Sequence, residues 1–104
     1  MTIERNFDDE NNWKFKIITN ILKKRSLIVL VFDQGKKELR DDAKEIIDEL
    51  NFLSSGELVL VKISIDLWLG STYTNLNEII HFLDTANFQR VIKGMELLRS
   101  NVYF

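Results

Sequence analysis

Two aspartates are the residues best placed to do chemistry. Asp33 directly follows the apolar run 27–32, and Asp66 lies near the end of the longer apolar run 57–70. Ligands of open α/β sheets bind outside the carboxyl ends of the strands, where two carboxylates can hold Mg²⁺ through their oxygens. The simpler interpretation is that Asp33 begins a turn and Asp66 faces solvent. We favour it, and predict no metal site and no cofactor.

The other chemically capable residues stand alone. Gly35, Lys36 and Lys37 precede a predicted helix, whose N-terminus attracts phosphate, but a phosphate-binding loop needs several glycines. His81 is the only histidine, and a partner for it cannot be identified from the sequence. The chain has no cysteine, which excludes disulfides and thiolate metal sites. We therefore predict no catalytic residue and expect that the protein is not an enzyme.

Acidic residues provide a stronger indication of binding. If residues 36–53 form one helix, several carboxylates share a narrow ridge beside its apolar stripe. The ridge comprises Glu38, Asp42, Glu45 and Glu49, and Asp41 and Asp48 flank it. Each pair of like charges four residues apart costs a few tenths of a kcal/mol. The ridge is either a solvated acidic face or a surface for a basic protein partner, whose association complementary charge would accelerate and orient.

Two aromatic residues are further binding candidates. Trp68 lies on the mixed face of a predicted strand, and Tyr73 lies in the loop that follows. Aromatic side chains are frequent anchors of protein interfaces. The alternative is that Trp68 packs under the predicted helix 86–99. The predicted partner-binding residues are Glu38, Asp41, Asp42, Glu45, Glu49, Trp68 and Tyr73.

Hydrophobic patterns predict the elements that position these residues. Apolar residues recur at every second position of 57–70, which is typical of a β-strand. Residues 27–32 are apolar at odd and even positions alike, as in a central strand that is buried on both faces. With helix 36–53 between them, the two strands would form a right-handed, parallel βαβ unit.

Helical spacing predicts three more helices, near 9–25, 75–83 and 86–99. Alternation over residues 13–18 also allows a strand, but acidic residues before this segment and basic residues after it favour a helix. The predicted fold is therefore a small single α/β domain with a short central sheet and four covering helices, in the order α-β-α-β-α-α. Residues 1–8 are expected to be flexible. Because two strands are not stable alone, we expect another strand from 2–7, 13–18 or 101–104, or from a second copy.

Composition narrows the class of partner. The chain has 104 residues and a net charge of −2, so it has no bulk attraction for nucleic acid or acidic membranes. It begins with a polar, acidic segment rather than a signal peptide, and contains no run of about 20 apolar residues. We expect a cytoplasmic protein that binds neither nucleic acid nor membranes.

These features favour a non-enzymatic protein-binding domain. In size and charge the chain is similar to bacterial immunity proteins, which neutralise toxin domains, although it shares no motif with them. A basic toxin domain would then be the partner. One alternative is a metal- or phosphate-handling enzyme or regulator that uses Asp33 and Asp66. The other is a homo-oligomeric scaffold, such as a homodimer that completes its sheet across a two-fold axis.

Overall fold

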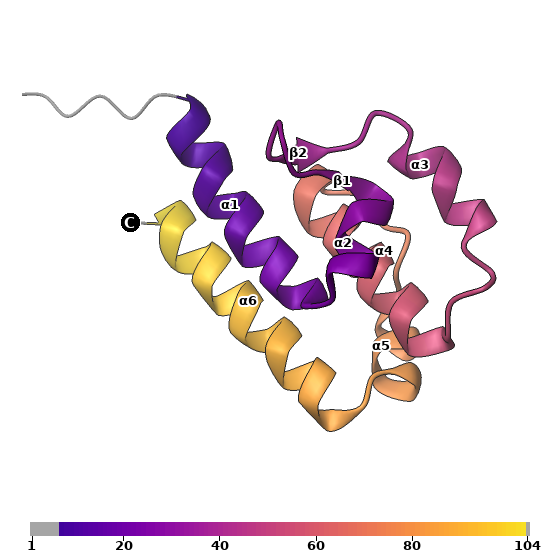
Figure 1. Cartoon of the computed structure of the whole chain (residues 1–104). Coiled ribbons are helices and arrows are strands. Elements are labelled where there is room, and N and C mark those ends of the chain that lie inside the picture. The colour runs from indigo at the N-terminus through magenta and orange to yellow at the C-terminus, as the bar shows by residue number, and fades with distance from the viewer. Residues whose placement is uncertain (1–6, 104) are drawn as a thin grey trace, which may run out of the picture.

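The computed structural model describes the chain from Phe7 to Tyr103, with side chains from Asn12 to Asn101 (Figure 1). Helices make up 71% of the structure, so the fold is mostly helical and the predicted α/β fold is wrong. The elements are α1 (Phe7–Leu22), α2 (Arg25–Val31), β1 (Phe32–Asp33), β2 (Glu38–Leu39), α3 (Ala43–Ile46), the 3-10 helix η1 (Ile47–Glu49), α4 (Ser55–Leu69), α5 (Leu76–Phe82) and α6 (Thr85–Tyr103).

The predicted strand 57–70 is the central helix α4. A capping box begins it: Ser54 Oγ accepts a hydrogen bond from Glu57 N at 3.2 Å, and Glu57 Oε1 accepts one from Ser54 N at 3.1 Å. Gly70 ends the helix in the left-handed conformation, with φ of 74°. Helix α4 packs against α1, α2 and α5. Because a helix covered on most sides is apolar nearly all round, the alternating pattern did not distinguish it from a strand.

The second predicted strand, 27–32, is mostly the short helix α2. Only its last residue, Phe32, enters β1, which pairs antiparallel with β2 so that Phe32 lies opposite Leu39. The described residues therefore contain no parallel βαβ unit. The expected completion of a sheet by a third strand or a second copy also loses its basis, because helices bury the apolar residues instead.

The predicted helix 36–53 is also wrong. Its first residues close the β1–β2 turn, in which Asp33 Oδ1 accepts hydrogen bonds from the backbone N–H groups of Gly35 and Lys36, at 2.9 and 3.0 Å. Only the short helices α3 and η1 form further on. Repulsion between neighbouring carboxylates disfavours a longer helix here. Gly56, just beyond the end of the predicted helix, lies in the first turn of α4.

The other three helices confirm the sequence predictions. Helices α1, α5 and α6 correspond to the segments predicted near 9–25, 75–83 and 86–99, and residues 13–18 are helical. Gly94 marks a close approach of α6 to α1, because a Cβ atom there would overlap the side chain of Ile21. The buried core lies mainly between α1, α2 and α4, and Val91 of α6 joins it.

Some predictions fall outside the described residues. Residues 1–6 and Phe104 are outside, and with them most of the segment 1–8 expected to be flexible and of the possible strand 2–7. Phe7 and Asp8 begin α1, and residues 101–103 complete α6 rather than a strand. Within the described part of the chain, no helix is both long and apolar enough to cross a membrane.

Candidate partner-binding site

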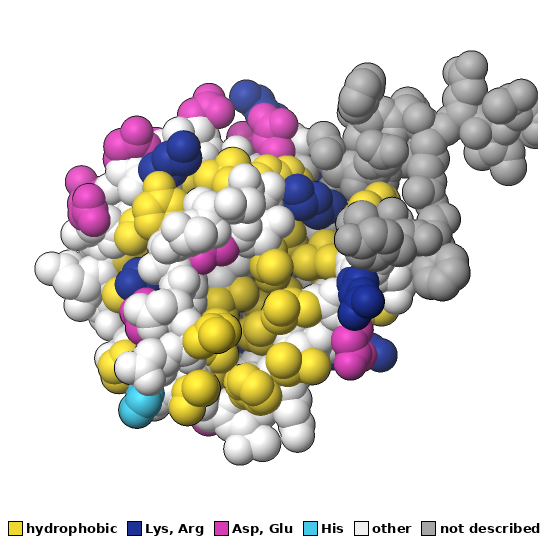
Figure 2. Space-filling model, turned by 180° about the vertical axis from the view of Figure 1, so that it is seen from behind, with side chains coloured by type: hydrophobic (Ala, Val, Ile, Leu, Met, Phe, Trp, Pro, Cys, Tyr) yellow, Lys and Arg dark blue, Asp and Glu magenta, His cyan; other side chains and the backbone are white. Residues whose placement is uncertain are grey.

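Most of the predicted acidic residues lie on a segment that we call the acidic arm, residues 41–52. Ala43 and Leu50 are buried, and Ile46 and Ile47 pack on the core, so the arm is held from beneath. The charged side chains of the arm are all exposed: Asp41, Asp42, Lys44, Glu45, Asp48 and Glu49. Figure 2 shows acidic side chains along the upper left edge of the molecule. The arm thus presents five carboxylates and one lysine to solvent.

Arg40 fixes the start of the arm. Its guanidinium binds Asp42 through two hydrogen bonds, Nε–Oδ1 at 3.0 Å and Nη2–Oδ2 at 2.9 Å. It also donates to the carbonyl of Val29 at 3.2 Å, in the last turn of α2, where a cation is favourable. The remaining carboxylates of the arm form no ion pair with any described residue: Asp41, Glu45, Asp48 and Glu49. Their charge is therefore available to a partner.

Phe52 is an exposed aromatic residue at the end of the arm, and the sequence interpretation missed it. It is 70% exposed, although an exposed aromatic ring is costly in water. A large ring beside carboxylates is typical of an interface anchor. One feature of the sequence pointed to it. Phe52 is apolar, but it does not lie on the apolar stripe predicted for residues 36–53.

A hollow of about 380 Å³ adjoins the arm and brings together three predicted residues, Glu38, Asp41 and Trp68. Trp68 is a half-buried wall of this hollow rather than an exposed anchor. Its ring packs edge-on against Phe32, with centroids 5.6 Å apart, and Lys14 Nζ lies 4.8 Å from the ring centroid. The tryptophan thus packs on β1 and α1, and its role in holding the fold outweighs its role at the surface.

Charges of both signs line this hollow. Lys14 lies at its wall, and burial lowers the pKa of the Lys14 ammonium, because desolvation disfavours the charged form. The ammonium also donates a hydrogen bond to the carbonyl of Trp68 at 2.8 Å. Arg40 and Lys44 add two more cations to the lining, together with the carboxylates of Glu38 and Asp41. The hollow therefore has mixed charge, whereas the outer surface of the arm is acidic.

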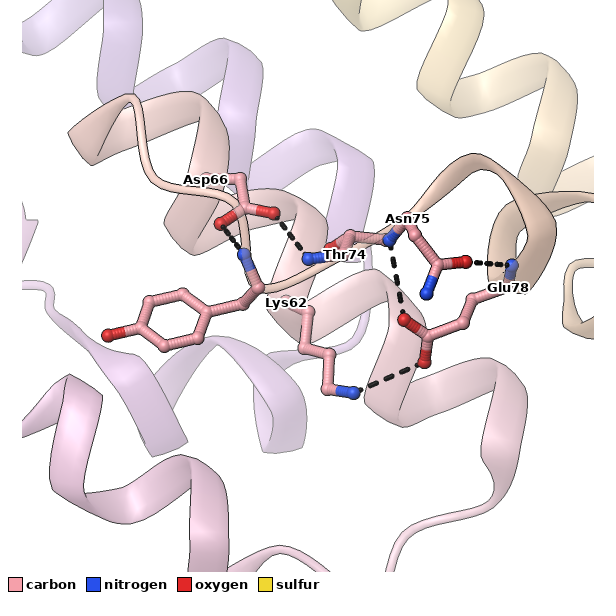
Figure 3. A network of polar contacts seen from close by, with 6 residues as sticks. Lys62, Asp66, Thr74, Asn75 and Glu78 are labelled. Carbon is pink, nitrogen blue, oxygen red and sulfur yellow. Dashed lines mark hydrogen bonds and ion pairs between the residues drawn. The ribbon is translucent and has the colours of Figure 1, made fainter.

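Asp66 organises the loop between α4 and α5. It accepts a hydrogen bond from the hydroxyl of Ser71. It also accepts hydrogen bonds from the backbone N–H groups of Tyr73 and Thr74, at 2.9 and 2.8 Å (Figure 3). Burial raises the pKa of Asp66, but these hydrogen bonds outweigh it and hold the pKa below its usual value. Tyr73, which is 38% exposed, is carried by this loop and does not line the hollow.

The same network anchors α5. Asn75 caps that helix by accepting from Glu78 N at 2.8 Å, and Lys62 Nζ lies 3.2 Å from Glu78 Oε2 (Figure 3). Lys62 and Asp66 are one helical turn apart on α4, so they lie on the same face. Asp66 therefore has a structural role, in which its oxygens bind the chain's own donors.

The remaining chemical candidates also serve local structure. Asp33 caps the hairpin turn, and His81 is exposed with its Nδ1 2.8 Å from the carbonyl oxygen of Asn77. Across residues 12–101, no cluster of three or more acidic or histidine side chains could hold a metal ion. The alternative that we considered, a metal site formed by Asp33 and Asp66, therefore has no geometric support among these residues.

Comparison with known proteins gives no assignment. No protein-family model matches the chain, and no curated protein or solved structure matches it. Function is therefore inferred from the residues and their geometry alone.

Proposed function

We propose that this chain is a non-enzymatic protein-binding domain whose acidic arm binds a basic partner. The observation that carries this proposal is the arm itself, with five exposed carboxylates, one lysine and an aromatic ring at its end. Buried Ala43 and Leu50 hold the arm in place. Because the arm is ordered before binding, association does not have to meet the entropic cost of folding it.

The chemistry of the arm indicates the kind of partner. Carboxylates that are not already paired attract lysine and arginine, and such complementarity increases the association rate and fixes orientation. Phe52 would enter an apolar pocket between those cations, where aromatic anchors contribute most of the affinity. A basic toxin domain meets both requirements. The best proposal is therefore a bacterial immunity or antitoxin protein that covers the substrate site of such a domain.

The proposed alternative of a metal- or phosphate-handling enzyme has less support. It would need the oxygens of Asp33 and Asp66, but each of these carboxylates already accepts hydrogen bonds from its own loop. A ligand at either residue would have to replace these contacts.

Charge reversal on the arm is the test of the proposed function. We expect Glu45→Lys/Glu49→Lys to slow association with a basic toxin domain encoded beside this gene by about tenfold or more at low salt. High salt should reduce the difference, because it screens exposed charges. Stability should change by less than about 0.5 kcal/mol, since both side chains are exposed. Surface plasmon resonance at two salt concentrations measures the rates.

A matched control separates the effect of charge on the arm from the effect of net charge on the association rate. Glu96→Lys on α6 changes the charge by the same amount as Glu45→Lys alone, and Glu96 is also exposed. We expect the Glu96 variant to associate nearly as fast as the unmodified chain. Equal slowing by both single variants would show that the arm has no special role.

A further inference from the structure

The face formed by α5 and α6 is apolar and open to solvent. Its large side chains are between 40 and 77% exposed: Leu76, Ile80, Phe82, Phe88, Ile92 and Met95. A groove of about 370 Å³ runs between the helices, lined in part by Ile79, Leu83 and Phe88. Figure 2 shows apolar side chains gathered in the lower part of this view. Exposed apolar side chains that gather on one face of a soluble protein often mark an interface.

Helix α6 has two apolar faces, and among the described residues only one of them packs against another helix. Val91 is buried and Gly94 contacts Ile21, so this face packs against α1. The other face carries Phe88, Ile92 and Met95, which we call the α6 stripe. Their spacing of four and three residues places them together along the helix. The described residues leave the stripe open to solvent.

The α6 stripe is complementary to itself in an antiparallel arrangement. Two antiparallel helices rise equally per residue, so residues at equal distances from a two-fold axis lie opposite each other. If the axis passes between positions 91 and 92, Phe88 lies opposite Met95 of the second copy. The two Ile92 side chains then meet beside the axis. The three members of the stripe are thus all covered by a second stripe.

The same register also pairs opposite charges. Asp84 and Arg99 are symmetric about the same point between positions 91 and 92, so each Asp84 lies opposite Arg99 of the second copy. Both are exposed, and neither takes part in an ion pair with another described residue. Arg99 is seven residues from Ile92 and shares its face of the helix. Two such pairs at the ends of the contact would select the antiparallel register.

We propose that two copies of this chain associate through their α6 stripes, antiparallel about a two-fold axis beside Ile92. Figure 1 shows α3 and α6 on opposite sides of the molecule, so this contact leaves the acidic arm free. The dimer would present two arms, and a partner with repeated basic sites would bind with avidity. The proposal does not depend on what the arm binds, because a different face carries it.

Sedimentation velocity of the purified chain tests the contact. We expect a dimer at about 100 µM, which corresponds to a dissociation constant in the micromolar range. Ile92→Glu should be monomeric with an unchanged far-UV circular dichroism spectrum. Leu97→Glu is the matched control, because Leu97 is exposed on α6 but points about 140° away from Ile92, and it should remain dimeric. A monomeric unmodified chain, or equal dissociation of both variants, would overturn the proposal.

Mixing two charge variants tests the register. Arg99→Asp and Asp84→Arg should each weaken self-association by about tenfold, because each places like charges opposite one another. Mixed together, they should form a heterodimer about as stable as the original dimer, since both ion pairs are restored. Asp84 also accepts a hydrogen bond from Asn87 N, which arginine cannot replace, so the far-UV circular dichroism spectrum of Asp84→Arg checks that α6 is intact. Arg99→Asp leaves this hydrogen bond in place and should weaken self-association on its own. If Arg99→Asp has no effect, or if the mixture associates no better than its separate components, the antiparallel register is wrong.

Discussion

Replacing Gly94 with leucine is expected to destabilise the fold by about 3 kcal/mol, because it overpacks the crossing of α1 and α6. A Cβ atom at Gly94 would lie 2.6 Å from Ile21 Cγ1 and overlap Cδ1 as well. Ile21 is completely buried, so its side chain has little space to move. Urea denaturation followed by circular dichroism measures the change in the free energy of unfolding.

A double-mutant cycle assigns this effect to one contact. Gly94→Ala alone combines a gain in helix propensity of about 1 kcal/mol with the steric cost of the added methyl group. Ile21→Val removes the Cδ1 atom that the methyl group would overlap, at a cost of about 1 kcal/mol. The double variant should therefore be more stable than the sum of the two single effects predicts. Additive effects would show that the helices do not approach closely at this point.

The second large effect is expected at Asp66. Asp66→Asn should lower the free energy of unfolding by about 2 kcal/mol, because the amide cannot accept all the hydrogen bonds that the carboxylate accepts from the α4–α5 loop. Asp41→Asn is the control, since Asp41 is exposed and forms no ion pair with the described residues. Thermal unfolding should show a lower melting temperature for the Asp66 variant alone. Equal melting temperatures for the two variants would contradict the role given to Asp66.

Asp66 also makes stability depend on pH. Its pKa in the folded protein lies below the usual value, because the loop hydrogen bonds outweigh burial. The stabilisation is therefore complete above the pKa of the unfolded chain and is lost as the pH falls through the folded pKa. Asp66→Asn should show a weaker loss of stability below about pH 4 than the unmodified chain. Identical acid dependence in both proteins would contradict this assignment.

The amphipathic helices were predictable from the sequence because solvent covers one side of each. In α1 and α6, apolar residues recur with helical spacing and charged residues occupy the rest, so the period is visible. Helix α5 also has a capping residue, Asn75, that marks its start. The close packing at Gly94 was likewise predictable, since glycine inside a helix is unfavourable without a packing reason.

The buried helices were not predictable from periodicity. Helix α4 buries consecutive residues, at odd and even positions alike. The apolar pattern of a helix that is covered on most sides therefore resembles that of a buried strand. Two indications pointed the other way. Ser54 and Glu57 form a capping box directly before the apolar run, and 15 residues is long for one strand. Weighting these two features would have favoured a helix.

Most residues of the candidate site were predicted from the sequence, but their arrangement in space was not. The predicted ridge needed one long helix, whereas the structure spreads its members over β2, a turn, α3 and η1. Most of these carboxylates are nevertheless exposed, because the apolar positions of the same segment anchor it to the core. Phe52 was missed, and Trp68 was assigned to a strand. Its contacts with Phe32 and Lys14 depend on tertiary packing that no local pattern shows.

Amide hydrogen exchange of the complex tests the central claim, that the acidic arm binds a basic protein partner, most directly. The chain is measured alone and with a basic toxin domain as the proposed partner, and exchange is followed along the sequence. We predict that binding slows exchange in the acidic arm, residues 41–52, and leaves α6 unchanged. Protection of other elements with no change in the arm would contradict the claim.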